Sequence, residues 1–536
     1  MKKWTRLIAA MLIAVVLLTG CSAAGFSGFL NDIFTAISLG TATNFSDMQY
    51  VRPDVDAFEA NLAICKEQAK TAKDVKSLMS PVTALYNQYY DFYTNYALAN
   101  IHYCKNMTDI YWDEEYSWCL ENASRIDSGL DQLLYALADS PLREALETED
   151  YFGENFFDAY EGESLWDETF TALMNQEAAL LDDYYELEAQ SATVEDYQEF
   201  MSGYGYELEK VYAELVIVRQ EIAEYAGYES YGQFAYEFTY QRDYTAQQAQ
   251  DYVRKIAQEL SPLYLQMDNT TWDALYTTST EEDTYAYLKS CVAAVGGVAE
   301  DALKLMEKAG LYDIAPGENK YGASFETFLY AYYEPFLFMN PSGYSMDKLT
   351  LVHEFGHFCN DYAVSGTVVG IDVAEVFSQG LEYLSICCTE EGKPLQQAKM
   401  ADSLSVFVEQ SLYAAFEFAV YELEEVTVEN IRNTFSRTCK EFGFDGYGID
   451  RRAYATVPHF YIAPMYVISY VVSNDVAMQL YQAEAKAPGE GVRQWENGLF
   501  SMQAGLLGFV EEMDLTSPFA EGRIEQIRDT LKAVLK

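Results

Sequence analysis

Thr350-Leu-Val-His353-Glu354-Phe-Gly-His357-Phe-Cys-Asn360 is the stretch around which the chain is organised, and it holds two of the four histidines in 536 residues. On an α-helix, positions four apart share a face, so the imidazoles of His353 and His357 can reach one metal ion. Glu354 then lies beside the open coordination position, where a carboxylate can deprotonate a zinc-bound water. The first hypothesis is therefore a zinc peptidase with Glu354 as its general base.

The third protein ligand that such a zinc site needs comes from outside this stretch. Only His102 and His459 remain elsewhere, which favours a carboxylate. Asp372 and Glu375 follow the second histidine by 15 and 18 positions. We favour Glu375 and interpret Asp372 as a cap or loop residue. Glu375 opens a predicted helix in which Glu382 shares its face, so one glutamate can bind zinc while the other orients a ligating histidine.

The residues just before the histidines predict two strands and a turn. Phe325–Tyr333 and Pro335–Asn340 are aromatic and apolar and show no helical period. Pro341–Tyr344 makes a turn, and Ser345 can cap the helix that follows. Strand, turn and metal helix is the order expected of a zincin, in which an edge strand beside the metal holds an extended peptide by backbone pairing.

Most of the remaining chain has a helical pattern. Apolar residues recur at three- and four-residue multiples in two clear sets: Phe170, Leu173, Met174, Leu181, Tyr184 and Leu187, then Val211, Leu215, Val218, Ile222 and Tyr225. Gly227 follows the second set as a C-terminal cap. We expect an N-terminal helical region over residues 46–315 and a zincin catalytic region over residues 316–536, in a mainly α fold with a small β-sheet.

The charge balance excludes some partners. The chain has 34 basic and 84 acidic residues and a formal charge of −50. Nucleic acid is excluded as a partner because too few Lys and Arg are present to neutralise phosphates. Neutral or cationic ligands are favoured, although a solvated acidic surface explains most of the charge.

The N-terminus predicts a lipoprotein signal peptide at residues 1–20 and a tether at residues 21–45. Basic residues precede an apolar run from Leu7 to Leu18, and Leu18-Thr-Gly-Cys21 resembles the lipobox of bacterial lipoproteins. The resemblance implies cleavage before Cys21 and diacylation of its thiol. We then expect an extracytoplasmic protein that is anchored to the cell membrane and contacts it only through the lipidated Cys21. An ordinary signal peptide or an uncleaved anchor is the alternative.

Eight cysteines remain in the mature chain. Cys104 and Cys119 could form a local disulfide in an oxidising compartment, but we favour buried free thiols for most of the eight. The chain has no CxxC pattern, which argues against a cysteine-based zinc site.

Several motifs together resemble the thimet oligopeptidase and oligoendopeptidase F family of zinc metallopeptidases. They are Pro335-Phe-Leu-Phe-Met-Asn, Leu351-Val-His353-Glu-Phe-Gly-His357, Ala374-Glu375-Val-Phe-Ser-Gln and Val457-Pro-His459-Phe-Tyr461-Ile-Ala-Pro-Met-Tyr466-Val-Ile-Ser-Tyr470. The last motif is similar to the oligoendopeptidase F branch, because it carries Pro458 and Pro464 where the thimet branch has a glycine-rich loop. The specific part of the resemblance extends from about Gly322 to Tyr470.

The resemblance implies a role for each of these positions. His353, His357 and Glu375 would bind one Zn²⁺ ion per chain, with Glu354 as general base. His459 would steady the substrate carbonyl and the oxyanion together with one or more of three tyrosines: Tyr461, Tyr466 and Tyr470. Of the three we favour Tyr466.

The resemblance also implies a gluzincin whose helical lobes surround a deep channel for short unstructured peptides. The expected activity is hydrolysis of internal peptide bonds by metal-activated water. Two alternatives remain open. One is a catalytically inactive peptide-binding lipoprotein with the same fold, and the other is a zinc carboxypeptidase.

Overall fold

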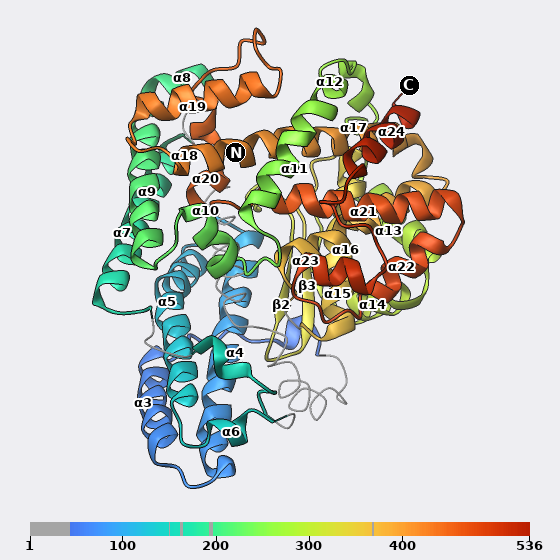
Figure 1. The fold of residues 1–536 in the computed structure, drawn as a ribbon. Helices are drawn as coiled ribbons and strands as arrows, with labels where there is room; N and C mark the ends of the chain where they lie inside the picture. The colour runs from blue at the N-terminus through green and yellow to red at the C-terminus, as the bar shows by residue number, and fades with distance from the viewer. Residues whose placement is uncertain (1–42, 149–150, 161–164, 192–196, 367–368, 536) are drawn as a thin grey trace.

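Figure 1 shows the chain in a computed structural model, which describes residues 43–148, 151–160, 165–191, 197–366 and 369–535. The expected signal peptide, the expected lipidation of Cys21 and nearly all of the expected tether lie outside the described residues. Among the helices that are described, none is both long enough and apolar enough to cross a membrane.

Three long helices form the first lobe, drawn in blue at the lower left of Figure 1. They are α3 (Val55–Thr71), α4 (Val75–Lys105) and α5 (Ile110–Ala138), and each packs against the other two. An aspartate precedes each helix, and its carboxylate accepts a hydrogen bond from a backbone N–H of the first turn: Asp54, Asp74 and Asp109.

A second lobe combines helices from both halves of the chain. They are α7 (Glu168–Ser191), α9 (Gly205–Tyr225), α18 (Ser411–Tyr421), α19 (Val428–Glu441) and α20 (Pro458–Ile462). The two helices predicted from apolar periodicity, α7 and α9, are confirmed. Gly227 lies just beyond the end of α9 with a φ of 84°, the left-handed conformation expected of a glycine that ends a helix.

The third group of helices surrounds the two histidines of the opening stretch. It contains α13 (Glu281–Val295), α14 (Gly297–Ala309), α15 (Met346–Val364), α16 (Ile371–Cys388), α21 (Ile468–Lys486) and α22 (Glu490–Gly498). The helix α16 lies between α15 and α21 and packs against both along its length. Its residues from Val373 to Ile386 are nearly all buried, so this helix is the centre of the core.

A small three-stranded sheet packs on α15. Its strands are β1 (Tyr312–Asp313), β2 (Phe325–Leu329) and β3 (Glu334–Phe338), in the order β1-β3-β2. β1 runs parallel to β3, and β2 pairs antiparallel with β3 from Phe325 opposite Phe338 to Leu329 opposite Glu334. The predicted strand pair is confirmed, although both strands are shorter than predicted. The mainly helical fold with a small sheet is likewise confirmed.

The other helices connect these groups. They are η1 (Phe45–Asp47), α6 (Arg143–Leu146), η2 (Phe156–Tyr160), α8 (Tyr197–Gly203), α10 (Tyr231–Phe234), η3 (Ala235–Thr239), α11 (Ala246–Glu259), α12 (Ser261–Tyr264), η4 (Asn269–Trp272), η5 (Lys393–Leu395), α17 (Gln396–Ser405), η6 (Val406–Gln410), η7 (Ala453–Thr456), α23 (Leu506–Glu512) and α24 (Arg523–Val534).

Two local predictions are wrong. Ser345 precedes α15, but its side chain makes no capping bond and its hydroxyl lies 2.8 Å from the hydroxyl of Thr277. The carboxylate of Asp347 instead accepts the N–H groups of the preceding turn, at 2.8 Å from Gly343. A carboxylate accepts several N–H groups more strongly than a hydroxyl does, so Asp347 organises the start of the helix. Glu375 does not open its helix either, because α16 begins one turn earlier, at Ile371.

The cysteines in the described part of the chain are all free, and six of these eight are buried. Cys104 and Cys119 therefore form no disulfide, and the preference for buried thiols is confirmed for most of the eight. Burial raises the pKa of the Cys119 thiol to about 12, which keeps it protonated and unreactive.

Candidate metal centre

The close approach of α15 and α16 depends on Gly356. A Cβ atom at this position would lie 2.6 Å from the Cα atom of Ser378 and 2.7 Å from the carbonyl oxygen of Phe377. Both contacts are with the backbone of α16, which cannot rotate away as a side chain could. Glycine at this position lets the two helices cross tightly and brings Glu375 up to the histidines of α15.

The crossing brings three potential ligands together. His353, His357 and Glu375 each offer one atom, and these atoms all lie within 4.8 Å of one another. The Oε2 atom of Glu375 lies 3.5 Å from Nε2 of His353 and 3.9 Å from Nε2 of His357. The two imidazole side chains are 23% and 19% exposed, so the group is open to solvent on the histidine side. Asp372, the other predicted candidate, is not part of this group.

A buried ion pair orients the first histidine. Glu382 Oε1 lies 2.8 Å from Nδ1 of His353, and Glu382 Oε2 lies 2.7 Å from Nζ of Lys399. Burial acts to raise the pKa of Glu382, but the charges of Lys399 and His353 outweigh it and hold the pKa at about 2. The permanent anion directs Nε2 of His353 toward Glu375, as the helical spacing of the two glutamates predicted.

The same charges shift the pKa values of the two histidines in opposite directions. Burial lowers the pKa of His353, but the hydrogen bond and charge of Glu382 outweigh it and raise the pKa to about 9. Burial and the charge of His353 lower the pKa of His357 to about 3. Glu382 therefore stabilises positive charge at His353, and His357 offers a neutral nitrogen lone pair.

Glu354 lies on α15 beside this group without belonging to it. The residue is buried, with an exposed fraction of 9%. Burial is the main cause that raises the pKa of Glu354 to about 7, against the opposing charge of His353. A carboxyl group with this pKa can both accept and release a proton near neutral pH.

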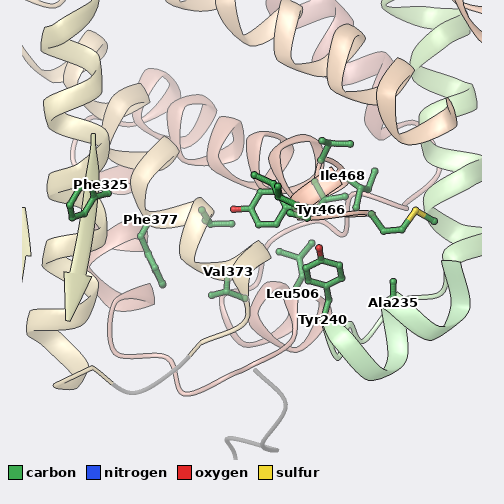
Figure 2. Close-up of a cluster of buried hydrophobic side chains, with 14 of the residues drawn as sticks. Ala235, Tyr240, Phe325, Val373, Phe377, Tyr466, Ile468 and Leu506 are labelled. Atoms are coloured by element: carbon green, nitrogen blue, oxygen red, sulfur yellow. The ribbon is translucent and has the colours of Figure 1, made fainter. Parts of the chain in front are cut away.

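The histidine- and tyrosine-bearing motif lies against the same site. The hydroxyl of Tyr466 donates to Oε1 of Glu375 at 3.3 Å, and Figure 2 shows this tyrosine in a buried cluster beside Val373 of α16. The hydroxyl of Tyr470 lies 3.5 Å from Nε2 of His459. Burial lowers the pKa of His459 to about 4 and raises the pKa of Tyr466 far above its usual value. Both side chains therefore present neutral hydrogen-bond donors at neutral pH.

Tyr461 is placed elsewhere. Its ring stacks on Tyr184 at 4.1 Å, and its hydroxyl donates to the carbonyl oxygens of Leu208 and Ala455. A buried hydroxyl that is committed to two backbone carbonyls is not aimed at the metal group. The choice among the three tyrosines is reduced to Tyr466 and Tyr470.

Two residues near the site, Lys399 and Asp361, were not predicted from the sequence. Lys399 carries no local signal, because its partner Glu382 lies on another helix. Asp361 does carry one, since it follows His357 by four positions and shares its face on α15. Its carboxyl group hydrogen-bonds Glu326 of β2, and burial raises the pKa of Asp361 to about 7. Burial and the charge of Asp361 raise the pKa of Glu326 well above its usual value, so Glu326 keeps its proton and donates it to Asp361.

Comparison with protein-family models gives two matches. Residues 45–164 match the Peptidase M3 N-terminal domain, and residues 298–496 match Peptidase family M3. The second match contains His353, Glu354, His357, Glu375 and His459, together with Tyr466 and Tyr470.

Individual relatives are distant in sequence and close in fold. An oligoendopeptidase F homologue from Borreliella burgdorferi is 24% identical over 170 residues, which are 28% of this chain and 29% of that protein. The match thus spans less than a third of that relative. A crystal structure described as an oligoendopeptidase F is similar with a TM-score of 0.79 and 20% identity, over 92% of this chain and 99% of the other. Another, from Bacillus anthracis str. Ames, has a TM-score of 0.77 and 21% identity, over 92% and 98%. At these identities the likeness establishes a shared fold.

Proposed function

Since the chain carries the two domains of peptidase family M3, we propose that it is a zinc-dependent oligopeptidase that hydrolyses internal bonds of short unstructured peptides. One observation carries the proposal. The ligand atoms of His353, His357 and Glu375 converge, with the buried carboxyl group of Glu354 beside them and the hydroxyl of Tyr466 against Glu375.

The donor set fits zinc. Two imidazole nitrogens and one carboxylate oxygen are the ligands of a catalytic zinc site, which keeps its fourth position open. Two ligand atoms bound tetrahedrally at typical zinc distances are about 3.3–3.5 Å apart. The 3.5 Å and 3.9 Å separations from Glu375 Oε2 to the histidines are close to this value.

The chain's own groups supply the proton transfers. When bound, zinc supplies Lewis acidity, which activates a water molecule and polarises the scissile carbonyl. Glu354 is the general base that takes the proton from water and returns it to the leaving amine. His459 donates a hydrogen bond to the carbonyl oxygen, on which negative charge develops, and the hydroxyl of Tyr466 turns its one proton from Glu375 to the same oxygen. No covalent intermediate with the enzyme is needed.

Short peptides are the proposed substrates, and the proposal includes no role for nucleic acid. The acidic composition favours neutral or cationic peptides. We also propose that the mature chain acts outside the cytoplasm, held to the cell membrane by a lipid on Cys21. A peptide-binding lipoprotein without activity and a zinc carboxypeptidase are the two competing functions.

A pool of peptides with acetylated N-termini and amidated C-termini separates these three functions. We expect internal cleavage, seen by mass spectrometry as paired fragments whose masses add up to the substrate plus one water. A carboxypeptidase would leave the blocked peptides intact and remove single residues from unblocked ones. A binding protein would retain peptides and cleave neither set. Either of these last two results would exclude the proposed endopeptidase.

A further inference from the structure

The backbone that carries His459 and Tyr466 is held by side chains from distant parts of the chain. Three buried side chains bond to it. Arg219 of α9 donates to the carbonyl oxygen of Phe460 at 2.8 Å and to that of Tyr461. Tyr240 donates to the carbonyl oxygen of Pro464 at 2.9 Å, and Glu417 of α18 accepts from the N–H of Met465 at 2.7 Å. Met465 has a φ of 64°, a left-handed conformation that is costly for a residue with a Cβ atom. These contacts therefore impose the shape of the segment.

Arg242 is the group that connects this segment to the metal centre. Its guanidinium donates to the carbonyl oxygen of Met465 at 3.0 Å and to the hydroxyl of Ser469 at 2.8 Å. Met465 directly precedes Tyr466, and Ser469 follows it by three residues. Its Nε atom lies 3.5 Å from Oδ2 of Asp372, which is three residues before Glu375 in α16. The Arg242 side chain is 1% exposed.

Aromatic rings fix the guanidinium in place. It lies 4.3 Å from the ring centre of Tyr240 and 4.4 Å from that of Tyr236, both within the range of cation–π attraction. The hydroxyl of Tyr244 donates to Oδ2 of Asp372 at 2.9 Å, so the carboxylate that faces the guanidinium is also fixed. Figure 2 shows Tyr240 in the same buried cluster as Tyr466 and Val373.

We infer that Arg242 is a positioning residue that fixes the hydroxyl of Tyr466 relative to the carboxylate of Glu375. It does so by linking Met465 and Ser469 to Asp372 in the first turn of α16. The inference rests on the proposed function, because it gives the link a purpose in catalysis. Arg242 lies between the two segments that match the family models, so neither match describes it.

A lysine at this position is the sharpest variant. Arg242→Lys keeps the charge, but an ammonium is a point donor and cannot reach the Met465 carbonyl, the Ser469 hydroxyl and Asp372 at once. A displacement of the order of 1 Å costs about 100-fold in rate. We expect kcat to fall about 100-fold while KM changes by less than about threefold, because the lost contact acts on the transition state. Arg254→Lys, on the exposed face of α11, is the matched control and should behave as wild type.

A double-mutant cycle distinguishes positioning from general stability. If Arg242 acts through Tyr466, Arg242→Lys should reduce kcat little further once Tyr466→Phe is present. A purely structural role would give independent losses that multiply. Multiplying losses, or a kcat for Arg242→Lys within about threefold of wild type, would overturn the inference.

Hydrogen exchange gives a readout that needs no activity. In Arg242→Lys, the amides of residues 458–470 should exchange at least about tenfold faster, while those of α3 to α5 stay unchanged. Unchanged exchange in this segment would contradict the inference. If the segment loosens but wild type cleaves no peptide, the proposed function fails and the structural link stands. Should Arg242→Lys not fold, Ser469→Ala removes one partner of the guanidinium and should give the same changes at smaller amplitude.

Discussion

Glu354→Gln is expected to lower turnover by orders of magnitude while the protein still folds and still binds its metal. The substitution keeps the size of the side chain and removes only its capacity to carry a proton. Glu354 lies outside the group of ligand atoms, so metal content should stay at the wild-type level. General acid–base groups contribute about 10²–10⁴-fold to rate, and kcat on a quenched peptide should fall by that factor.

The control for this variant is Glu422→Gln, which makes the same chemical change on an exposed residue. It should leave both kcat and metal content unchanged. If Glu354→Gln kept wild-type activity with its metal in place, Glu354 would not be the general base. If wild type and Glu354→Gln bound the same peptides equally and neither cleaved them, the inactive binding protein would be the better account.

Glu375→Gln is expected to lose the metal. An amide oxygen is a much weaker ligand than a carboxylate, and the two histidines alone make an incomplete site. Changes to residues that only orient a ligand weaken metal binding by about 10–100-fold, so removal of a ligating charge should exceed that range. Dissociation constants from competition with a chromophoric chelator would measure the loss.

Asp372→Asn is the matched variant because it makes the same isosteric change on the same helix at the other predicted ligand. Asp372 faces Arg242 and Tyr244, and not the histidines. The Asp372→Asn protein should therefore keep its metal and show a lower melting temperature or a lower kcat. The opposite result, with metal lost in Asp372→Asn and kept in Glu375→Gln, would make Asp372 the third ligand.

The core of the site could be predicted because it depends on helical spacing. The i and i+4 positions of His353 and His357 fix a shared face whatever the rest of the chain does. The same rule predicted that Glu382, seven positions after Glu375, shares its face of the helix and can orient a ligating histidine. Helical spacing does not predict where a helix starts, because capping depends on which nearby side chain hydrogen-bonds the free N–H groups. At α15 the predicted Ser345 makes no capping bond, and Asp347 instead accepts N–H groups of the turn before the helix.

The surroundings of the site could not be predicted because they depend on contacts between distant segments. Arg242 and Met465 are 223 positions apart, and Arg219 and Phe460 are 241 apart. No local pattern marks a buried arginine, and a single sequence gives no pairing between such positions. The fold supplies the explanation, since the second lobe combines helices from both halves of the chain and so brings α9 against α20.

The central claim is that this chain cleaves peptides with one zinc ion held by His353, His357 and Glu375. The most direct test is to strip the wild-type protein with a chelator, then add zinc back in steps while bound metal and cleavage of a doubly blocked peptide are measured together. We expect no cleavage without metal and a linear rise that ends at one zinc per chain. Full cleavage by protein shown to hold less than a tenth of a metal ion per chain would contradict the claim.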